Sequence, residues 1–298
     1  MLILVMVITP TLAIGNSSVI NSTCASLSQQ PYDYCVGVLS ADPAAANATD
    51  ARGVATAAVN ITAHKAASTL QVITYLIDEL NTCHEIYGFM EEKLSGVLTD
   101  FGAGRFDEAA LEKAMNVTGD PVGCDIMLFE GNSHKDPISG ENGDNISWVN
   151  LASAILDSIQ PYDYCVGVLS ADPAAANATD ARGVATAAVN ITAHKAASTL
   201  QVITYLIDEL NTCREIYGTM EGLLASVLTD IRASRFDVPA VEKALNASGA
   251  PNDCDIMLFE GNSHKDPISG ENGDNDSWAR LAGAILESVV SKASKRGP

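Results

Sequence analysis

The chain has 298 residues, 47% of them hydrophobic, which is enough to bury one or two ordinary cores. Its 37 acidic and 17 basic residues give a formal net charge of −20, which excludes nucleic acid as a partner because phosphates require a basic face. The same charge disfavours binding to pectin, a polyanion, and suits a basic protein partner, although it also serves solubility alone.

The chain starts with an apolar run of about 14 residues, too short to span a bilayer. Ala13 and Gly15 lie where a small-x-small cleavage site belongs, so we predict a signal peptide over residues 1–15, with a buried N-terminal helix as the alternative. Nothing else resembles a transmembrane segment. Ten Asn-x-Ser/Thr sequons agree with export, and we expect N-glycosylation at the solvated ones. The candidates are Asn16, Asn21, Asn47, Asn60, Asn116, Asn145, Asn177, Asn190, Asn246 and Asn275.

The sequence consists largely of two copies of one unit. Residues 31–83 recur without change at 161–213, and residues 124–145 recur at 254–275, both at an offset of 130. Two copies at this period indicate a doubled domain and not a solenoid. We therefore predict a first domain over residues 16–160 and a second over residues 161–298.

Each copy has the apolar spacing of helices, by threes and fours, and no strand-like alternation. Two short helices, near 20–28 and 32–39, are expected to form an N-terminal hairpin. Four longer helices with short connections favour an antiparallel bundle in each copy, so the predicted fold is all-α. These helices are expected at 49–81, at 85–101, from 106 with an interruption at 119–123, and at 146–159.

Seven cysteines in an exported chain predict disulfides, and the odd count leaves one over. At the repeat offset, Cys35 matches Cys165, but Cys24 matches Ala154. The second copy therefore lacks the partner that Cys24 offers to Cys35.

These features, in this order, resemble the plant pectin methylesterase inhibitors and invertase inhibitors, and most of all the putative invertase inhibitors of pollen. The resemblance covers nearly all of residues 22–159 and most of 161–290. The motifs that carry it are Cys24 before PYDYCVGVLSADP at 31–43, Cys83 with a tyrosine four residues on, EKAM before Cys124, and DPISGENGD before LASAIL at 151–156.

The resemblance implies a four-helix bundle with an N-terminal helical hairpin. It also implies the disulfides Cys24–Cys35 and Cys83–Cys124, and the repeat adds Cys213–Cys254. Cys165 would then be an unpaired thiol, able to form an intermolecular disulfide, in a second domain that lacks most of its hairpin.

The function implied is that of a secreted inhibitor, acting in the cell wall (apoplast) or the vacuole. Its partner would be a carbohydrate-active enzyme, either pectin methylesterase or acid invertase, bound in a stoichiometric complex. An abundant pollen or seed protein that keeps the fold without inhibiting is the alternative.

The invertase inhibitors of this family offer a Pro-Lys-Phe segment to the enzyme, so the matching segments are the candidate target contacts. Arg could pair with a catalytic carboxylate while the ring stacks on a sugar subsite. Alternatively, the phenylalanine is a core residue at a helix start and the arginine a solvated charge. The candidates are Gly104, Arg105 and Phe106 in the first copy and Ser234, Arg235 and Phe236 in the second.

The sequence carries no HExxH, CxxC or GxSxG motif. The acidic segment at 141–145 lacks the ligand spacing of a calcium loop and is interpreted as a solvated turn. We therefore predict no enzymatic activity, no cofactor and no metal.

Overall fold

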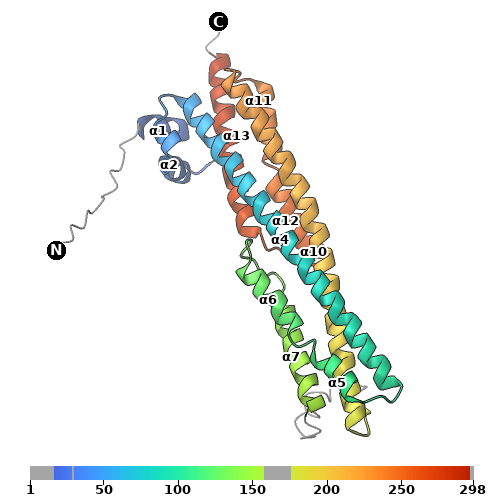
Figure 1. Cartoon of the computed structure of the whole chain (residues 1–298). Coiled ribbons are helices and arrows are strands. Elements are labelled where there is room, and N and C mark those ends of the chain that lie inside the picture. Colours follow the sequence, from blue (N-terminus) through green and yellow to red (C-terminus); the bar gives the residue numbers. More distant parts are fainter. Residues whose placement is uncertain (1–16, 29, 158–175, 296–298) are drawn as a thin grey trace, which may run out of the picture. The chain divides into compact units, whose positions relative to one another are not determined.

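The computed structural model describes residues 17–28, 30–157 and 176–295 (Figure 1). The predicted signal peptide, Asn16, Cys165 and the join between the repeats lie outside these residues. Within the described residues every regular element is a helix, so the predicted all-α class is confirmed.

The N-terminal hairpin consists of α1 (Ser17–Cys24), α2 (Tyr32–Ser40) and α3 (Pro43–Ala46), which pack against one another. A disulfide joins Cys24 to Cys35, with their Cα atoms 5.8 Å apart. The carboxylate of Asp42 accepts a hydrogen bond from the backbone N–H of Ala45 at 2.8 Å and so caps α3.

The long helix α4 (Ala51–Gly102) runs for 52 residues without interruption. The expectation of two helices, at 49–81 and 85–101, was therefore wrong. No glycine or proline lies between Gly53 and Gly88, so nothing in the sequence ends the helix near Cys83. Buried residues recur along it at intervals of three and four without a break, at 55, 59, 62, 66, 69, 73, 76, 80, 83, 87, 90, 94, 97 and 101.

The first copy continues with α5 (Glu108–Met115), α6 (Asp120–Glu130) and α7 (Ser139–Asp157). The interruption expected at 119–123 lies earlier, at 116–119, because Pro121 is tolerated in the first turn of α6. α7 starts seven residues before the expected position. The segment 141–145, interpreted as a solvated turn, is therefore helical.

The second copy repeats this order. Its elements are α10 (Ala181–Arg232), α11 (Val238–Ala247), α12 (Ala250–Glu260) and α13 (Ser269–Lys295). α10 also has 52 residues and the same unbroken buried phase as α4.

The protein forms two compact units, and each combines parts of both copies. Of the described residues, unit 1 contains those up to Thr69 together with 216–253 and 270–295. Unit 2 contains 70–157, 176–215 and 254–269. The predicted division at residue 160 thus describes the sequence repeats, with which the compact units do not coincide.

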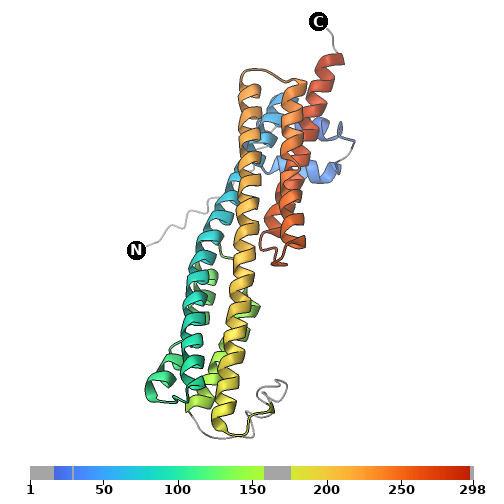
Figure 2. The same cartoon turned by 90° about the vertical axis from the view of Figure 1, so that its right-hand side faces the viewer.

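In unit 1, the first half of α4 lies beside α13, the closing helix of the second copy (Figures 1 and 2). In unit 2, α7 packs on the first half of α10, where Ala152 contacts a cluster formed by Val184, Ala187 and Ala188. The two copies have therefore exchanged the first halves of their long helices.

Candidate target-binding surface

The turn after α4 contains the first predicted contact segment. Gly104 has a φ of +76°, which a residue without Cβ adopts at no cost, and the backbone N–H of Arg105 donates to the carbonyl of Asp100 at 2.8 Å. The Arg105 guanidinium also binds the Asp100 carboxylate, with Nη2 2.5 Å and Nε 3.2 Å from Oδ1. Lys113 from α5 binds Oδ2 at 3.0 Å. Arg105, followed by Lys113, lowers the pKa of Asp100.

Phe106 is half-buried between two partners. Its ring stacks on that of Phe101, with the centroids 4.3 Å apart and the planes 18° from parallel. The guanidinium of Arg182, at the start of α10, lies 5.1 Å from the ring centroid, within the range of a cation–π contact. The ring also borders a cavity of about 250 Å³ that Leu111 and Ile155 help to line.

The turn after α10 reproduces this arrangement. Ser234 has a φ of +63°, and Arg235 binds Asp230 at 2.5 Å. Lys243 binds the same carboxylate at 2.7 Å and, ahead of Arg235, lowers the pKa of Asp230. The guanidinium of Arg52, at the start of α4, lies 5.0 Å from the ring centroid of Phe236.

Both predicted segments therefore lie in turns that are internally bonded. Each arginine has a carboxylate partner, yet its side chain is still 53% exposed at Arg105 and 54% at Arg235. Each phenylalanine lies beneath an arginine of the other copy, Arg182 or Arg52, so each turn is built from both copies.

A second exposed surface was missed by the sequence reasoning. Val122, Ile126 and Phe129 on α6 are 37%, 51% and 73% exposed, although large apolar side chains of this kind are usually buried. We call these three residues the α6 outer face. Their spacing of four and three places them on one side of the helix, while Cys124 and Leu128 are fully buried. The sequence of α6 has apolar residues on two sides of the helix, and this pattern could have indicated the exposed surface.

The second copy has a reduced version of this surface. Ile256 and Phe259 on α12 are 46% and 76% exposed, and we call them the α12 outer face. Asn252 stands where the first copy has Val122, and Thr219 stands where it has the exposed Phe89. At these two positions the second copy therefore lacks an exposed apolar side chain that the first copy has.

The structure distinguishes buried sequon asparagines from exposed ones. Asn145 and Asn275 are each 1% exposed, and each amide donates a 2.8 Å hydrogen bond to a buried threonine, Thr199 or Thr69. A glycan requires a solvated side chain, so we expect these two residues to be unmodified in the folded protein. Four other candidates, Asn47, Asn116, Asn177 and Asn246, are exposed, and Asn21, Asn60 and Asn190 are partly exposed.

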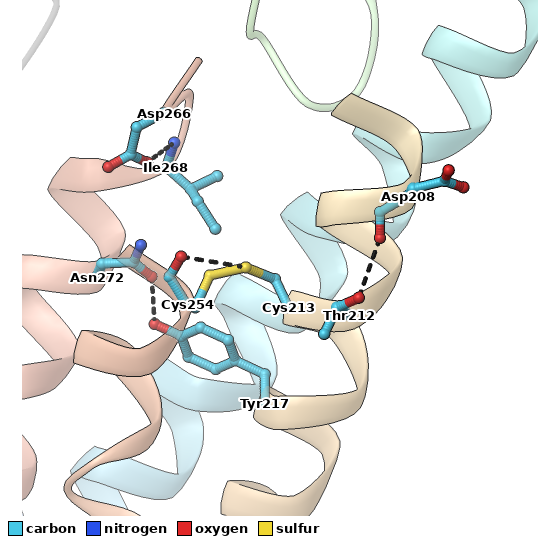
Figure 3. The surroundings of a disulfide bond; sticks show 8 residues. All are labelled: Asp208, Thr212, Cys213, Tyr217, Cys254, Asp266, Ile268 and Asn272. Carbon is cyan, nitrogen blue, oxygen red and sulfur yellow. Dashed lines mark hydrogen bonds between the residues drawn. A yellow bond between two sulfur atoms is a disulfide. The ribbon is translucent and has the colours of Figure 1, made fainter. Parts of the chain in front are cut away.

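Two further disulfides hold the closing part of each copy to its long helix. Cys83 pairs with Cys124 and Cys213 with Cys254, both with Cα atoms 5.1 Å apart. These are the pairings that the resemblance and the repeat implied. Figure 3 shows the Cys213–Cys254 bond.

Each long helix also makes a buried hydrogen bond to its own closing helix. The hydroxyl of Tyr217 donates to the amide oxygen of Asn272 at 2.8 Å (Figure 3), and Tyr87 makes the same bond to Asn142 at 2.9 Å. Burial raises the pKa of Tyr87 well above its ordinary value, so this hydroxyl stays a donor.

Among residues 17–28, 30–157 and 176–295, no three His, Cys, Asp or Glu side chains are grouped so as to hold a metal ion. No helix in this part of the protein is long and apolar enough to cross a membrane.

The comparison with protein families decides what kind of protein this is. The model of the plant invertase/pectin methylesterase inhibitor family matches residues 18–157 and again residues 153–287. The chain belongs to this family. Its two matches cover both sequence copies, so the inhibitor domain occurs twice in tandem. Searches of curated proteins and of solved structures gave no significant match.

Proposed function

We propose that this inhibitor-family protein binds and blocks a carbohydrate-active enzyme of the plant cell wall, either pectin methylesterase or acid invertase. The observation that carries the proposal is the match of the inhibitor family to both copies. The protein itself has no catalytic activity on this proposal and acts by occupying the enzyme in a stoichiometric complex. It is secreted to the cell wall, as the apolar N-terminal run and the exposed sequons support.

The α6 outer face is the principal contact on this proposal. Phe129 and Ile126 are large, exposed and free to enter a pocket of a partner, as the anchors of protein interfaces do. Glu130, an exposed acidic residue of the same helix, directly follows Phe129. An enzyme with a basic rim around an apolar depression would suit this surface and the net charge of −20.

The two arginine-phenylalanine turns are the second proposed contact. Half of each arginine side chain is open to solvent, so Arg105 and Arg235 are available to a carboxylate of the target. Phe106 and Phe236 are held by internal partners and contribute mainly to the shape of the turn.

The test is a titration of the purified full-length protein against a plant pectin methylesterase and, separately, against a cell-wall invertase. We expect saturable inhibition of one of the two, and a complex that survives gel filtration, since standard inhibitor interfaces bury about 1,600 Å². A folded protein that inhibits neither enzyme would contradict the proposal and favour the non-inhibitory alternative.

Paired variants locate the contact. Ile126→Ala with Phe129→Ala should weaken inhibition about 30-fold, the loss expected from removing interface anchors. The matched variant Ile256→Ala with Phe259→Ala reports whether the second copy contributes. Arg105→Ala with Phe106→Ala should weaken inhibition less. If only this last variant loses inhibition while its helicity is unchanged, the turn and not the α6 outer face is the principal contact.

A further inference from the structure

Besides the contact of Arg52 with Phe236, three polar contacts join the first half of α4 to the second copy. The hydroxyl of Thr62 donates to the Trp278 carbonyl at 3.2 Å, and Lys65 binds Asp274 at 3.1 Å. The buried hydroxyl of Thr69 accepts a hydrogen bond from the amide of Asn275 at 2.8 Å.

The first half of α10 meets the first copy through the matching set, at an offset of 130. Thr192 approaches the Trp148 carbonyl at 3.5 Å, and Lys195 binds Asp144 at 3.2 Å. The Thr199 hydroxyl accepts from the amide of Asn145 at 2.8 Å. Both sets use the same residue types in the same order.

Because the groups are the same, the first half of a long helix cannot distinguish one closing helix from another. Residues 51–69 of α4 are identical to residues 181–199 of α10, and the acidic and amide partners lie in the identical segments 124–145 and 254–275. Chemistry alone would let α4 pair with α7 of its own copy. In the structure, residues 51–69 instead belong to the compact unit that contains most of α13, while the rest of α4 belongs to the unit that contains α7.

Each closing helix is meanwhile held by the second half of its own long helix. In the first copy, the Cys83–Cys124 disulfide and the Tyr87–Asn142 hydrogen bond fix α6 and α7 to α4 beyond residue 79. A copy is therefore complete at one end and requires the closing helix of another copy at the other end. Cys83–Cys124 joins residues of the first copy and Cys213–Cys254 joins residues of the second. Exchange of partners between copies therefore does not require either disulfide to open.

We propose that the first half of α4, and equally that of α10, is a pairing surface for the closing helix of any copy of the repeat, including one in a second molecule of this protein. Within one molecule the second copy occupies the surface first, because its effective concentration is on the order of millimolar. When molecules refold together at high concentration, a second molecule supplies the closing helix instead. The protein then forms dimers that use the same contacts.

The experiment uses two full-length variants, and neither variant by itself can form a lysine–aspartate cross-link at these contacts. The arginine variant carries Lys65→Arg and Lys195→Arg, and the asparagine variant carries Asp144→Asn and Asp274→Asn. Both pairs of changes affect exposed ion pairs, which contribute little to stability. The two variants are mixed, unfolded in denaturant with disulfides intact, refolded, and treated with a carbodiimide that joins contacting amines and carboxylates.

The expected product is a covalent heterodimer in which a lysine of the asparagine variant, at 65 or 195, is joined to an aspartate of the arginine variant, at 144 or 274. Its yield relative to monomer should rise about in proportion to the protein concentration during refolding. Mixing without unfolding should lower the yield. The proposal is overturned if this linkage is absent at protein concentrations up to about a tenth of a millimolar while the wild-type protein forms it within one molecule. It is also overturned if the yield does not depend on protein concentration or on prior unfolding.

Discussion

The two halves of α4 bond to different copies of the repeat. From residue 79 onward its partners belong to its own copy, as in the hydrogen bond from the Ser133 backbone N–H to the buried carboxylate of Glu79 at 3.0 Å. Up to residue 69 its partners belong to the other copy, as in the contact between Thr69 and Asn275. Which copy a residue of α4 contacts therefore depends on its position along the helix, since the contacting segments are identical in the two copies.

The largest effect is expected from the bonds that hold a copy to its own long helix. Replacing Cys83 and Cys124 by alanine opens a loop of 41 residues and should cost about 4 kcal/mol of unfolding free energy. The matched change at Cys24 and Cys35, which closes only 11 residues, should cost about 3 kcal/mol. Urea denaturation monitored by circular dichroism measures both. Equal, negligible losses would show that the disulfides do not constrain the unfolded chain.

The contacts between copies should be weaker individually. Thr69→Val leaves one buried N–H of Asn275 without its acceptor and should cost about 1–3 kcal/mol. Thr199→Val should cost the same in the other unit. The control is Thr82→Val, because the exposed Thr82 hydroxyl bonds only within α4. A loss at Thr82 as large as that at Thr69 would contradict the contact between copies.

The sequence predicted the hairpin, the helical class and the repeat, because local spacing and cysteine positions encode them. It also contained the signal for a single long helix, since the unbroken phase from Ala55 to Phe101 passes through Cys83. The exchange could not be read from it, because Asp144 and Asp274 are chemically equal partners for Lys65. At the site, the sequence located the two turns, but not the arginine of the other copy that covers each ring, because that contact joins segments far apart in the sequence.

The two turns differ in the residue that adopts the positive φ, which is glycine in the first and serine in the second. Substitutions there should have a smaller effect. Gly104→Ala places a Cβ on a residue at φ +76° and should lower the free energy of unfolding by about 1 kcal/mol. The added Cβ meets no steric clash, because no atom lies within 4 Å of it. Ser234→Gly relieves the same strain at φ +63° and should stabilise unit 1 slightly. Melting temperatures of the two variants should move in opposite directions. Shifts of the same sign would contradict this account of the turns.

The smallest effect concerns the loop between α6 and α7. Burial raises the pKa of Asp136 to about 6, and the neighbouring carboxyls Asp125 and Glu141 contribute to the rise. Between the unfolded value of 3.8 and about 6, the folded state holds a proton that the unfolded state has released, so stability falls as the pH rises through this window.

Asp136→Asn should flatten that fall, and Asp144→Asn, which changes an exposed carboxylate, should not. Melting temperatures recorded across the window measure both. An unchanged slope in the Asp136 variant would assign the pH dependence to other groups.

Cross-linking of a single variant shows whether the first half of α4 packs on the second copy or on its own copy. In Lys195→Arg, Lys65 is the remaining lysine of the pair, and a carbodiimide joins it to the carboxylate it touches in the dilute monomer. The partner is identified by mass, because Asp144 is followed by Asn-Ile-Ser and Asp274 by Asn-Asp-Ser. We predict an intramolecular Lys65–Asp274 bond, as their 3.1 Å contact requires. A Lys65–Asp144 bond would show that each copy closes on itself and would contradict the exchange.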